Sequence, residues 1–210
     1  MQTQEIEKRV FTIQFREIAD DIEQNPTPGE AKAQSRTVEG YAALFNSKTS
    51  IGGWFDEVIE PGAFTEALAI SDVRALFNHD PNYILARSTS GTLEVKQDNK
   101  GLFYRFAVPN TNFGNDFLEM LRRGDVSQSS FAFTVQKQRW EEEKIGDEEK
   151  VTRVIEKVEQ IYDVSPVTYP AYPETTVSAR SRANEIQKPI ISNNNVVDSL
   201  ERDLQLLKML

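Results

Sequence analysis

The stretch Thr92-Leu-Glu-Val-Lys-Gln-Asp-Asn-Lys-Gly-Leu-Phe-Tyr-Arg-Phe-Ala-Val108 decides the fold class of this chain. Two extended segments, 92–97 and 102–108, flank the turn-forming residues Asp98-Asn-Lys-Gly101, which is the pattern of a β-hairpin. Further extended segments lie on both sides of it, at 6–18, 37–45, 54–59, 73–77, 83–86, 131–135 and 151–167. Many short strands with few helices predict a mainly β fold, a β-barrel or sandwich with helical decoration.

Two helices are expected within this β framework. Residues 61–69 are predicted to form a short helix, because Pro61 is tolerated at a first helical position. Residues 112–123 carry apolar side chains at helical spacing, and Gly124 is placed to end that helix. The acidic segment 141–150 is predicted to be an exposed connection.

Composition excludes several classes of site. The chain of 210 residues has no Cys, so it has no disulfide, Cys-ligated zinc, iron–sulfur cluster or Cys nucleophile. It has one His, His79, which excludes multi-histidine metal sites. The net charge of −9 argues against non-specific binding to nucleic acid or to an anionic membrane. No run of apolar residues is long enough for a membrane span, no signal peptide is recognisable, and we expect no cofactor.

The chain is expected to divide into a folded domain, residues 1–180, and a tail, residues 181–210. A loop is predicted at 20–36, and the tail begins with linker-like residues rich in Ser and Asn. It ends with apolar residues at helical spacing: Val197, Leu200, Leu204 and Leu207. This amphipathic helix is expected to pack on its own domain or on a partner, and its polar face is not basic enough for a membrane surface.

His79 is the only side chain that could provide an imidazole. If the strand predicted at 73–77 continues to His79, this residue shares a face with Val73, Ala75 and Phe77, at the end of an inward-facing row. A partly buried imidazole there could act as a general base. On the pattern alone, a hydrogen-bonded structural histidine is the alternative interpretation.

Ser130 is the candidate nucleophile among three neighbouring serines. Phe131 and Phe133 would occupy one face of their strand, whereas Ser130 and Ala132 would occupy the other. Small residues beside Ser130 leave that face open for another chain to approach, while Ser129 would share the crowded Phe face. An ordinary turn is the alternative interpretation of the serines.

Asp163 is the candidate acidic partner. It lies in an otherwise apolar run that includes Ile161, Tyr162, Val164 and Val167. A carboxylate in such surroundings usually accepts several hydrogen bonds or orients a base. With His79 and Ser130, it completes a set that could carry nucleophilic catalysis.

Four ordered motifs resemble those of the prohead proteases of tailed bacteriophages, which are distant relatives of the herpesvirus assemblin proteases. The resemblance covers about residues 37–178. The motifs are Glu57-Val-Ile-Glu-Pro-Gly-Ala-Phe64, Ala75-Leu-Phe-Asn-His-Asp80, Gly124-Asp-Val-Ser-Gln-Ser-Ser-Phe-Ala-Phe133 and Asp163-Val-Ser-Pro-Val-Thr-Tyr-Pro-Ala171.

The resemblance implies a herpesvirus-protease-like β-barrel with a few helices and a protease domain at residues 1–180. It implies a serine endopeptidase located in the immature capsid in the host cytoplasm, with His79, Ser130 and Asp163 as its triad. Its substrates would be scaffold protein, or the scaffold-like segment of the major capsid protein, and itself, and it allows a homo-oligomer. Ala132 stands where the family more often has Gly.

Two other functions compete with this reading. One is a non-catalytic capsid assembly or scaffolding factor on the same fold. The other is an unrelated β-barrel binding module in which His79, Ser130 and Asp163 never meet. The distance between the His79 and Ser130 side chains discriminates between the enzyme and the binding module.

Overall fold

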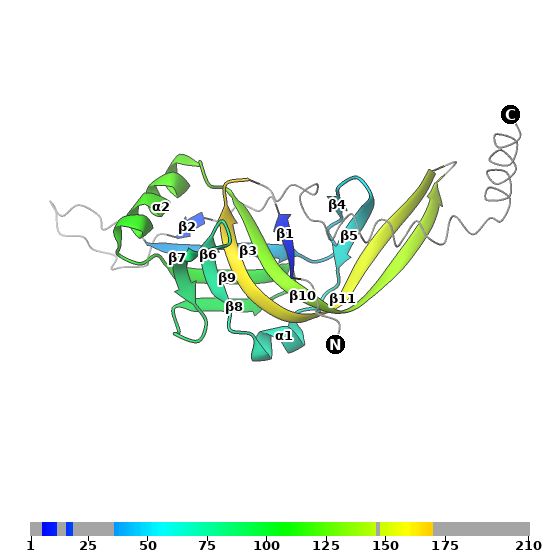
Figure 1. Ribbon diagram of the computed structural model, residues 1–210, viewed down its shortest axis with the longest axis horizontal. Helices are drawn as coiled ribbons and strands as arrows, with labels where there is room; N and C mark the ends of the chain where they lie inside the picture. The colour runs from blue at the N-terminus through cyan, green and yellow to red at the C-terminus, as the bar shows by residue number, and fades with distance from the viewer. Residues whose placement is uncertain (1–5, 12–15, 19–35, 146–147, 170–210) are drawn as a thin grey trace, which may run out of the picture.

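The computed structural model describes residues 6–11, 16–18, 36–145 and 148–169, and their strands form two sheets (Figure 1). The larger sheet has the order β1 (Glu7–Phe11), β10 (Gln128–Ile145), β11 (Glu148–Val167), β5 (Phe55–Ile59) and β4 (Thr49–Ile51). Two more strands belong to this sheet: β6 (Arg74–Phe77) pairs with β11, and β7 (Asp80–Arg87) pairs with β6. The smaller sheet has the order β2 (Arg16–Ile18), β3 (Thr37–Leu44), β9 (Gly101–Ala107) and β8 (Leu93–Gln97). The helices are α1 (Thr65–Ile70) and α2 (Asn112–Arg123).

The mainly β class is confirmed, but the expected closed barrel is wrong, because the two sheets of the described residues do not close on each other. One edge of β11 is shared by two short strands: β5 pairs with its first half and β6 with its second half. A barrel needs continuous pairing around its circumference. Here the pairing ends at short edge strands instead.

The segment 6–18, expected to be one strand, contains two strands in different sheets. β1 pairs with β10 in the larger sheet, and β2 pairs with β3 in the smaller one. The expected loop at 20–36 lies almost wholly outside the described residues, as do the boundary at residue 180 and the C-terminal helix.

The segment 141–150 is exposed at its described positions, as predicted, but the prediction that it is a connection is wrong. β10 and β11 continue through most of this segment as a two-stranded hairpin that projects beyond β4 and β5 (Figure 1). Its charged residues pair across the strands with opposite sign, Glu143 opposite Lys150 and Lys144 opposite Glu149. Such cross-strand pairs stabilise an exposed ladder, so a charged composition here does not indicate a loop.

The pairing of β10 with β11 is interrupted by several β-bulges. Register shifts occur at four places between Ala132 and Gln138. Bulges bend a strand and increase its twist. The pair curves accordingly, so its two ends serve different purposes: one carries the candidate site, and the other forms the projecting hairpin (Figure 1).

The core lies where the sheets and the two helices meet. Phe131 and Phe133 of β10 stack with ring centroids 4.4 Å apart, and Phe64 meets Phe131 edge to face at 5.7 Å. Tyr104 of β9 and Phe117 of α2 are also fully buried in this cluster. The strand that carries the candidate nucleophile is therefore held rigidly by aromatic packing on its other face.

Helix α2 has the predicted bounds. The Thr111 hydroxyl accepts a hydrogen bond from the Gly114 amide at its start, and Gly124 ends it in the left-handed conformation with φ 80°. Helix α1 begins at Thr65 instead of residue 61. Gly62 has φ 90°, which is incompatible with a helix and moves its start.

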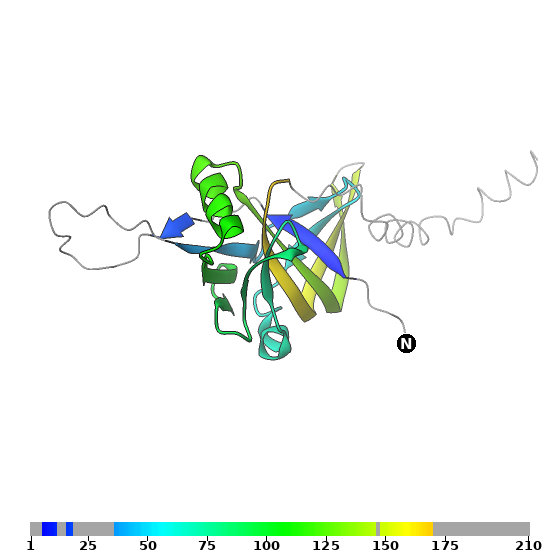
Figure 2. The same cartoon turned by 60° about the vertical axis from the view of Figure 1, so that its left-hand side comes forward.

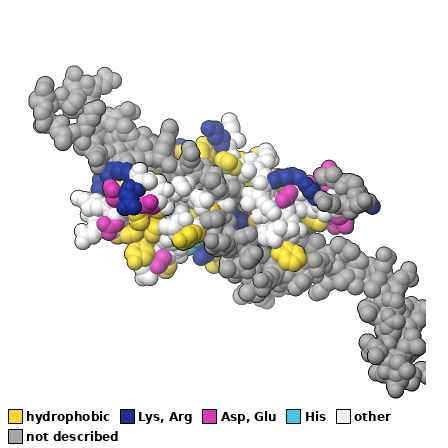
Figure 3. All heavy atoms as spheres, turned by 90° about the horizontal axis from the view of Figure 1, so that it is seen from above, with side chains coloured by type: hydrophobic (Ala, Val, Ile, Leu, Met, Phe, Trp, Pro, Cys, Tyr) yellow, Lys and Arg dark blue, Asp and Glu magenta, His cyan; other side chains and the backbone are white. Residues whose placement is uncertain are grey.

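The charged side chains of the described surface are of mixed sign. On the face seen in Figure 3, Lys and Arg side chains lie in separate groups beside Asp and Glu. In the part of the chain that the structure describes, no helix is both long and apolar enough to cross a bilayer.

The close packing of β9 against β3 generates a stability prediction. A Cβ added to Gly101 would lie 1.9 Å from the backbone carbonyl oxygen of Ala43, so Gly101→Ala forces the two strands apart. We expect a loss of about 1–3 kcal/mol in the free energy of unfolding, measured by urea denaturation. Asn99→Ala, in the exposed turn of the same hairpin, is the control and is expected to change stability by less than about 0.5 kcal/mol. Equal midpoints for both variants would contradict the prediction.

Candidate active site

His79 lies in the tight turn between β6 and β7. Asn78 and His79 both adopt the left-handed conformation, with φ 55° and 58°. The predicted extension of the strand face to His79 is therefore wrong, because the chain reverses before that residue. The turn is tied to the end of β11: the Asn78 amide donates to the Pro166 carbonyl at 3.0 Å, and the Thr168 amide donates to Asn78 Oδ1 at 2.9 Å. These bonds hold the histidine against β11.

Strand register places the other two candidates. Ser130 of β10 is directly opposite Ser165 of β11, and Ala132 is opposite Asp163. Opposite residues share a face, and residues two apart along a strand share it too. Ser130, Ser165 and Asp163 therefore lie on one face of the sheet, opposite to the aromatic core.

The structure brings the three predicted site residues together in one hydrogen-bonded chain. His79 Nδ1 lies 2.6 Å from Asp163 Oδ1, and His79 Nε2 lies 2.6 Å from Ser130 Oγ. Because a carboxylate oxygen only accepts, Nδ1 carries a hydrogen, which leaves Nε2 available as an acceptor for the Ser130 hydroxyl. The side chains of His79 and Asp163 are each 9% exposed.

Ser165 is a fourth member of the site that sequence reasoning did not single out. It is fully buried, and its hydroxyl donates to Asp163 Oδ1 at 2.6 Å. The same carboxylate oxygen thus accepts from both His79 and Ser165. The two-residue spacing of Asp163 and Ser165 on one strand was the available signal, since that spacing puts both side chains on one face.

The neighbouring Ser129 faces the opposite side of the sheet, as the alternation predicts. Its hydroxyl lies 2.9 Å from the Tyr104 hydroxyl, and both residues are fully buried in the core. Burial raises the pKa of the Tyr104 hydroxyl. Two adjacent serines therefore have different environments, one in the core and one beside the imidazole.

The face around Ser130 is not open, contrary to the sequence prediction. β1 pairs along β10, with Val10 opposite Ser130, and runs beside it in Figure 2. The Ser130 hydroxyl donates to the Arg9 carbonyl at 2.9 Å, and Ser130 is fully buried. The chain that lies beside Ser130 at the β10 edge is therefore a segment of this protein itself.

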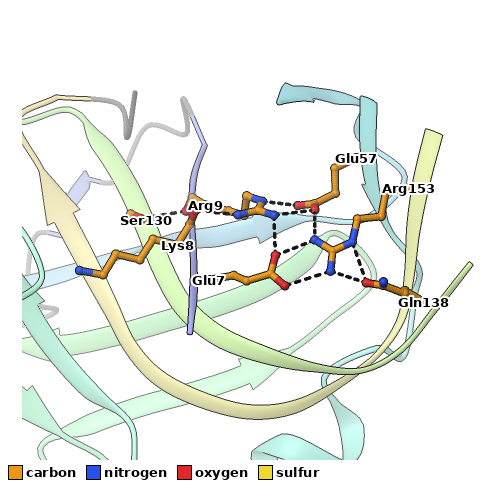
Figure 4. A network of polar contacts seen from close by, with 7 residues as sticks. All are labelled: Glu7, Lys8, Arg9, Glu57, Ser130, Gln138 and Arg153. Carbon is orange, nitrogen blue, oxygen red and sulfur yellow. Dashed lines mark hydrogen bonds and ion pairs between the residues drawn. The ribbon is translucent and has the colours of Figure 1, made fainter. Parts of the chain in front are cut away.

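Four charged side chains form a closed ring next to this contact (Figure 4). Arg153 donates to Glu7 and to Glu57, with Nη1–oxygen distances of 2.6 and 2.8 Å. Arg9 also donates to both carboxylates, to Glu7 at 2.6 Å and to Glu57 at 2.5 Å. Gln138 accepts from the Arg153 guanidinium. We call Glu7, Arg9, Glu57 and Arg153 the ionic ring.

The ionic ring is almost completely removed from solvent. The side chain of Arg153 is 0% exposed, those of Glu7 and Glu57 are 2% exposed, and that of Arg9 is 11% exposed. Burial opposes the charge of Arg9, but the carboxylates of Glu57 and Glu7 outweigh it and raise the pKa of the guanidinium. Alternating charges thus compensate one another within the ring.

Comparisons with known proteins identify the family of the chain. The model of the family described as caudovirus prohead serine protease matches residues 23–189. Among solved structures, the bacteriophage T4 capsid assembly protease gp21 matches with 11% identity and a TM-score of 0.42, covering 78% of this chain and 99% of that chain. No curated protein sequence matches. Because the family model spans well over half of its residues, the chain belongs to the caudovirus prohead serine protease family.

Proposed function

We propose that this protein is a serine endopeptidase of capsid maturation in which Ser130 is the nucleophile, His79 the general base and Asp163 the residue that orients it. The observation that carries the proposal is the unbroken chain from Asp163 Oδ1 through both His79 nitrogens to Ser130 Oγ, with two contacts of 2.6 Å. Membership of a serine protease family supports the same chemistry.

The contacts among the three side chains suit the proton transfers of peptide hydrolysis. As Ser130 Oγ attacks the scissile carbonyl carbon, its proton passes to His79 Nε2, and Asp163 stabilises the imidazolium through Nδ1–H. The imidazolium then gives the proton to the leaving amine, and the C–N bond breaks to leave an ester on Ser130. A water molecule, deprotonated by His79, hydrolyses that ester and restores the hydroxyl.

We propose further that the substrates are capsid proteins in the prohead, inside the host cell. Family membership supports capsid proteins as a class. The specific substrates that we propose are the scaffold protein or the scaffold-like segment of the major capsid protein, and the protease itself. A substrate segment must be extended to reach Ser130, because the nucleophile lies on a sheet strand next to a paired edge.

Replacement of the nucleophile tests the proposal directly. Ser130→Ala is expected to reduce turnover by about a million-fold, which removes detectable processing of scaffold and capsid protein on co-expression. Ser129→Ala, which removes the adjacent hydroxyl on the core face, is the matched control and is expected to retain processing. Processing at a normal rate by Ser130→Ala, or its loss only in Ser129→Ala, would refute the assignment.

The role of Asp163 predicts a smaller fall in kcat than the loss of the nucleophile. Asp163→Asn keeps the shape of the side chain but offers its amide nitrogen or oxygen to Nδ1, so the neutral imidazole is no longer held with its hydrogen on Nδ1. We expect kcat to fall by about ten-thousand-fold while the thermal unfolding midpoint changes little. A variant that retains most of its activity would show that another group orients His79.

Ser165 is expected to position the carboxylate without touching the substrate. Ser165→Ala removes one of two hydrogen bonds to Asp163 Oδ1, and bonds to charged groups contribute about 1.5–3 kcal/mol. We expect kcat to fall by roughly tenfold to a hundredfold with KM unchanged. Ser165→Thr keeps the hydroxyl and is expected to restore most of kcat, and failure of this rescue would assign Ser165 a packing role alone.

A further inference from the structure

β1 occupies the place that a substrate needs. A scissile carbonyl carbon must come within about 3–3.5 Å of the nucleophilic oxygen. In the structure, the Arg9 carbonyl oxygen lies 2.9 Å from Ser130 Oγ, and Ser130 has no exposed surface. The β10 edge that would pair with a substrate strand is taken by residues 7–11. β1 and a substrate therefore exclude each other.

The contact with Arg9 also competes with the proposed base. Ser130 Oγ carries a single hydrogen, and two acceptors lie within bonding distance of it, His79 Nε2 at 2.6 Å and the Arg9 carbonyl at 2.9 Å. When the hydroxyl donates to Arg9, its hydrogen points away from the imidazole. The strand thus both occupies the β10 edge next to the nucleophile and accepts its proton in a hydrogen bond.

The ionic ring divides evenly between β1 and the rest of the protein. β1 contributes Glu7 and Arg9, whereas β5 and β11 contribute Glu57 and Arg153, which also bind each other at 2.8 Å. When β1 leaves, Glu57 and Arg153 remain a neutral pair. The site can therefore release one strand and accept another without leaving a single buried charge unpaired.

We propose that the β10 edge and the Glu57–Arg153 pair form the substrate-binding site, and that β1 is a built-in occupant which the ionic ring holds beside Ser130 at that edge. The ligand class is an extended peptide with an acidic and a basic residue two positions apart, as Glu7 and Arg9 are. Such a peptide adds a strand to β10 and rebuilds the ring. This inference rests on the proposed function.

Reversing the two charges of β1 tests the proposal. In the full-length double variant Glu7→Arg with Arg9→Glu, like charges face each other at both ends of the ring while composition and net charge stay the same. The readout is labelling of Ser130 by a fluorophosphonate, in which an Oγ–phosphorus bond forms and fluoride leaves, followed by mass spectrometry. We expect labelling at least about tenfold faster than in the wild type.

Two further variants serve as a control and as a substitute for the charge-reversed protein. Lys8→Ala is the matched control, because Lys8 is exposed and points away from the ring (Figure 4), and it is expected to be labelled at the wild-type rate. If the charge-reversed protein does not fold, Glu7→Gln with Arg9→Gln replaces it, since this pair removes the β1 charges and leaves Glu57 and Arg153 paired. Hydrogen exchange is expected to rise in residues 7–11 and to stay unchanged in α2.

A free peptide then tests the ligand class. A peptide with the sequence of residues 6–11, Ile-Glu-Lys-Arg-Val-Phe, is expected to slow labelling of the charge-reversed protein. Its counterpart with Glu and Arg exchanged is expected to bind about tenfold more weakly, because it meets like charges at Glu57 and Arg153. Equal inhibition by both peptides would overturn the proposed ligand class.

The outcomes separate this inference from the proposed function. If the wild type and the variants are labelled at the same rate, and this labelling depends on His79, the role of β1 is overturned and the proposed function stands. If a variant is folded and shows faster hydrogen exchange in β1, yet Ser130 is not labelled, both the role of β1 and the proposed function are overturned. Cleavage of the wild type within residues 7–11 would make β1 a substrate and overturn its role as an occupant.

Discussion

The antiparallel pairing of β10 with β11 is the interaction on which the rest of the structure depends. Its register sets Ser130 opposite Ser165 and Ala132 opposite Asp163, so one face of two adjacent strands holds all the site groups except the histidine. The other face of β10 carries Phe131 and Phe133 into the core. A slip of one residue would exchange the two faces and place Ser129 instead of Ser130 on the face of the site. Packing of the core and geometry of the site are therefore one constraint.

The imidazole reaches this face through the two-residue turn between β6 and β7. Asn78 and His79 both have positive φ there, a geometry that closes a tight hairpin but costs side chains other than Gly some conformational energy. The Asn78 bonds to Pro166 and Thr168 offset that cost and tie the turn to the strand that carries Asp163. Strain at a position that holds a reacting group agrees with the catalytic role that we propose for His79.

The ionic ring explains how a charged strand can pair beside a strand that carries a buried nucleophile. Breaking a buried ion pair by removing one partner typically costs about 3–5 kcal/mol, whereas exchanging a whole neutral unit avoids most of that cost. Glu7 and Arg9 enter and leave as such a unit, because they are two residues apart on one strand. A set of charges that contributes little to net stability can in this way govern which strand occupies the β10 edge.

Features that depend on local chemistry can be predicted from the amino-acid sequence. Turn residues and alternation were enough for the mainly β class, for helix α2 with Gly124 at its end, and for the separation of Ser129 from Ser130 onto opposite faces. The motif resemblance supplied the family, and the single His restricted the candidates for a base.

The remaining features depend on contacts between distant parts of the chain. His79 does not continue the strand face of Val73, Ala75 and Phe77, because the chain turns at Asn78. The acidic segment 141–150 has the composition of a loop, but it forms strands because its charges are paired across β10 and β11. The ionic ring joins residues 146 positions apart, Glu7 and Arg153, and no local pattern encodes such a contact. The physical reason is the same in each case: strand pairing and buried charge depend on partners that are distant in the chain, and those partners are set by the fold.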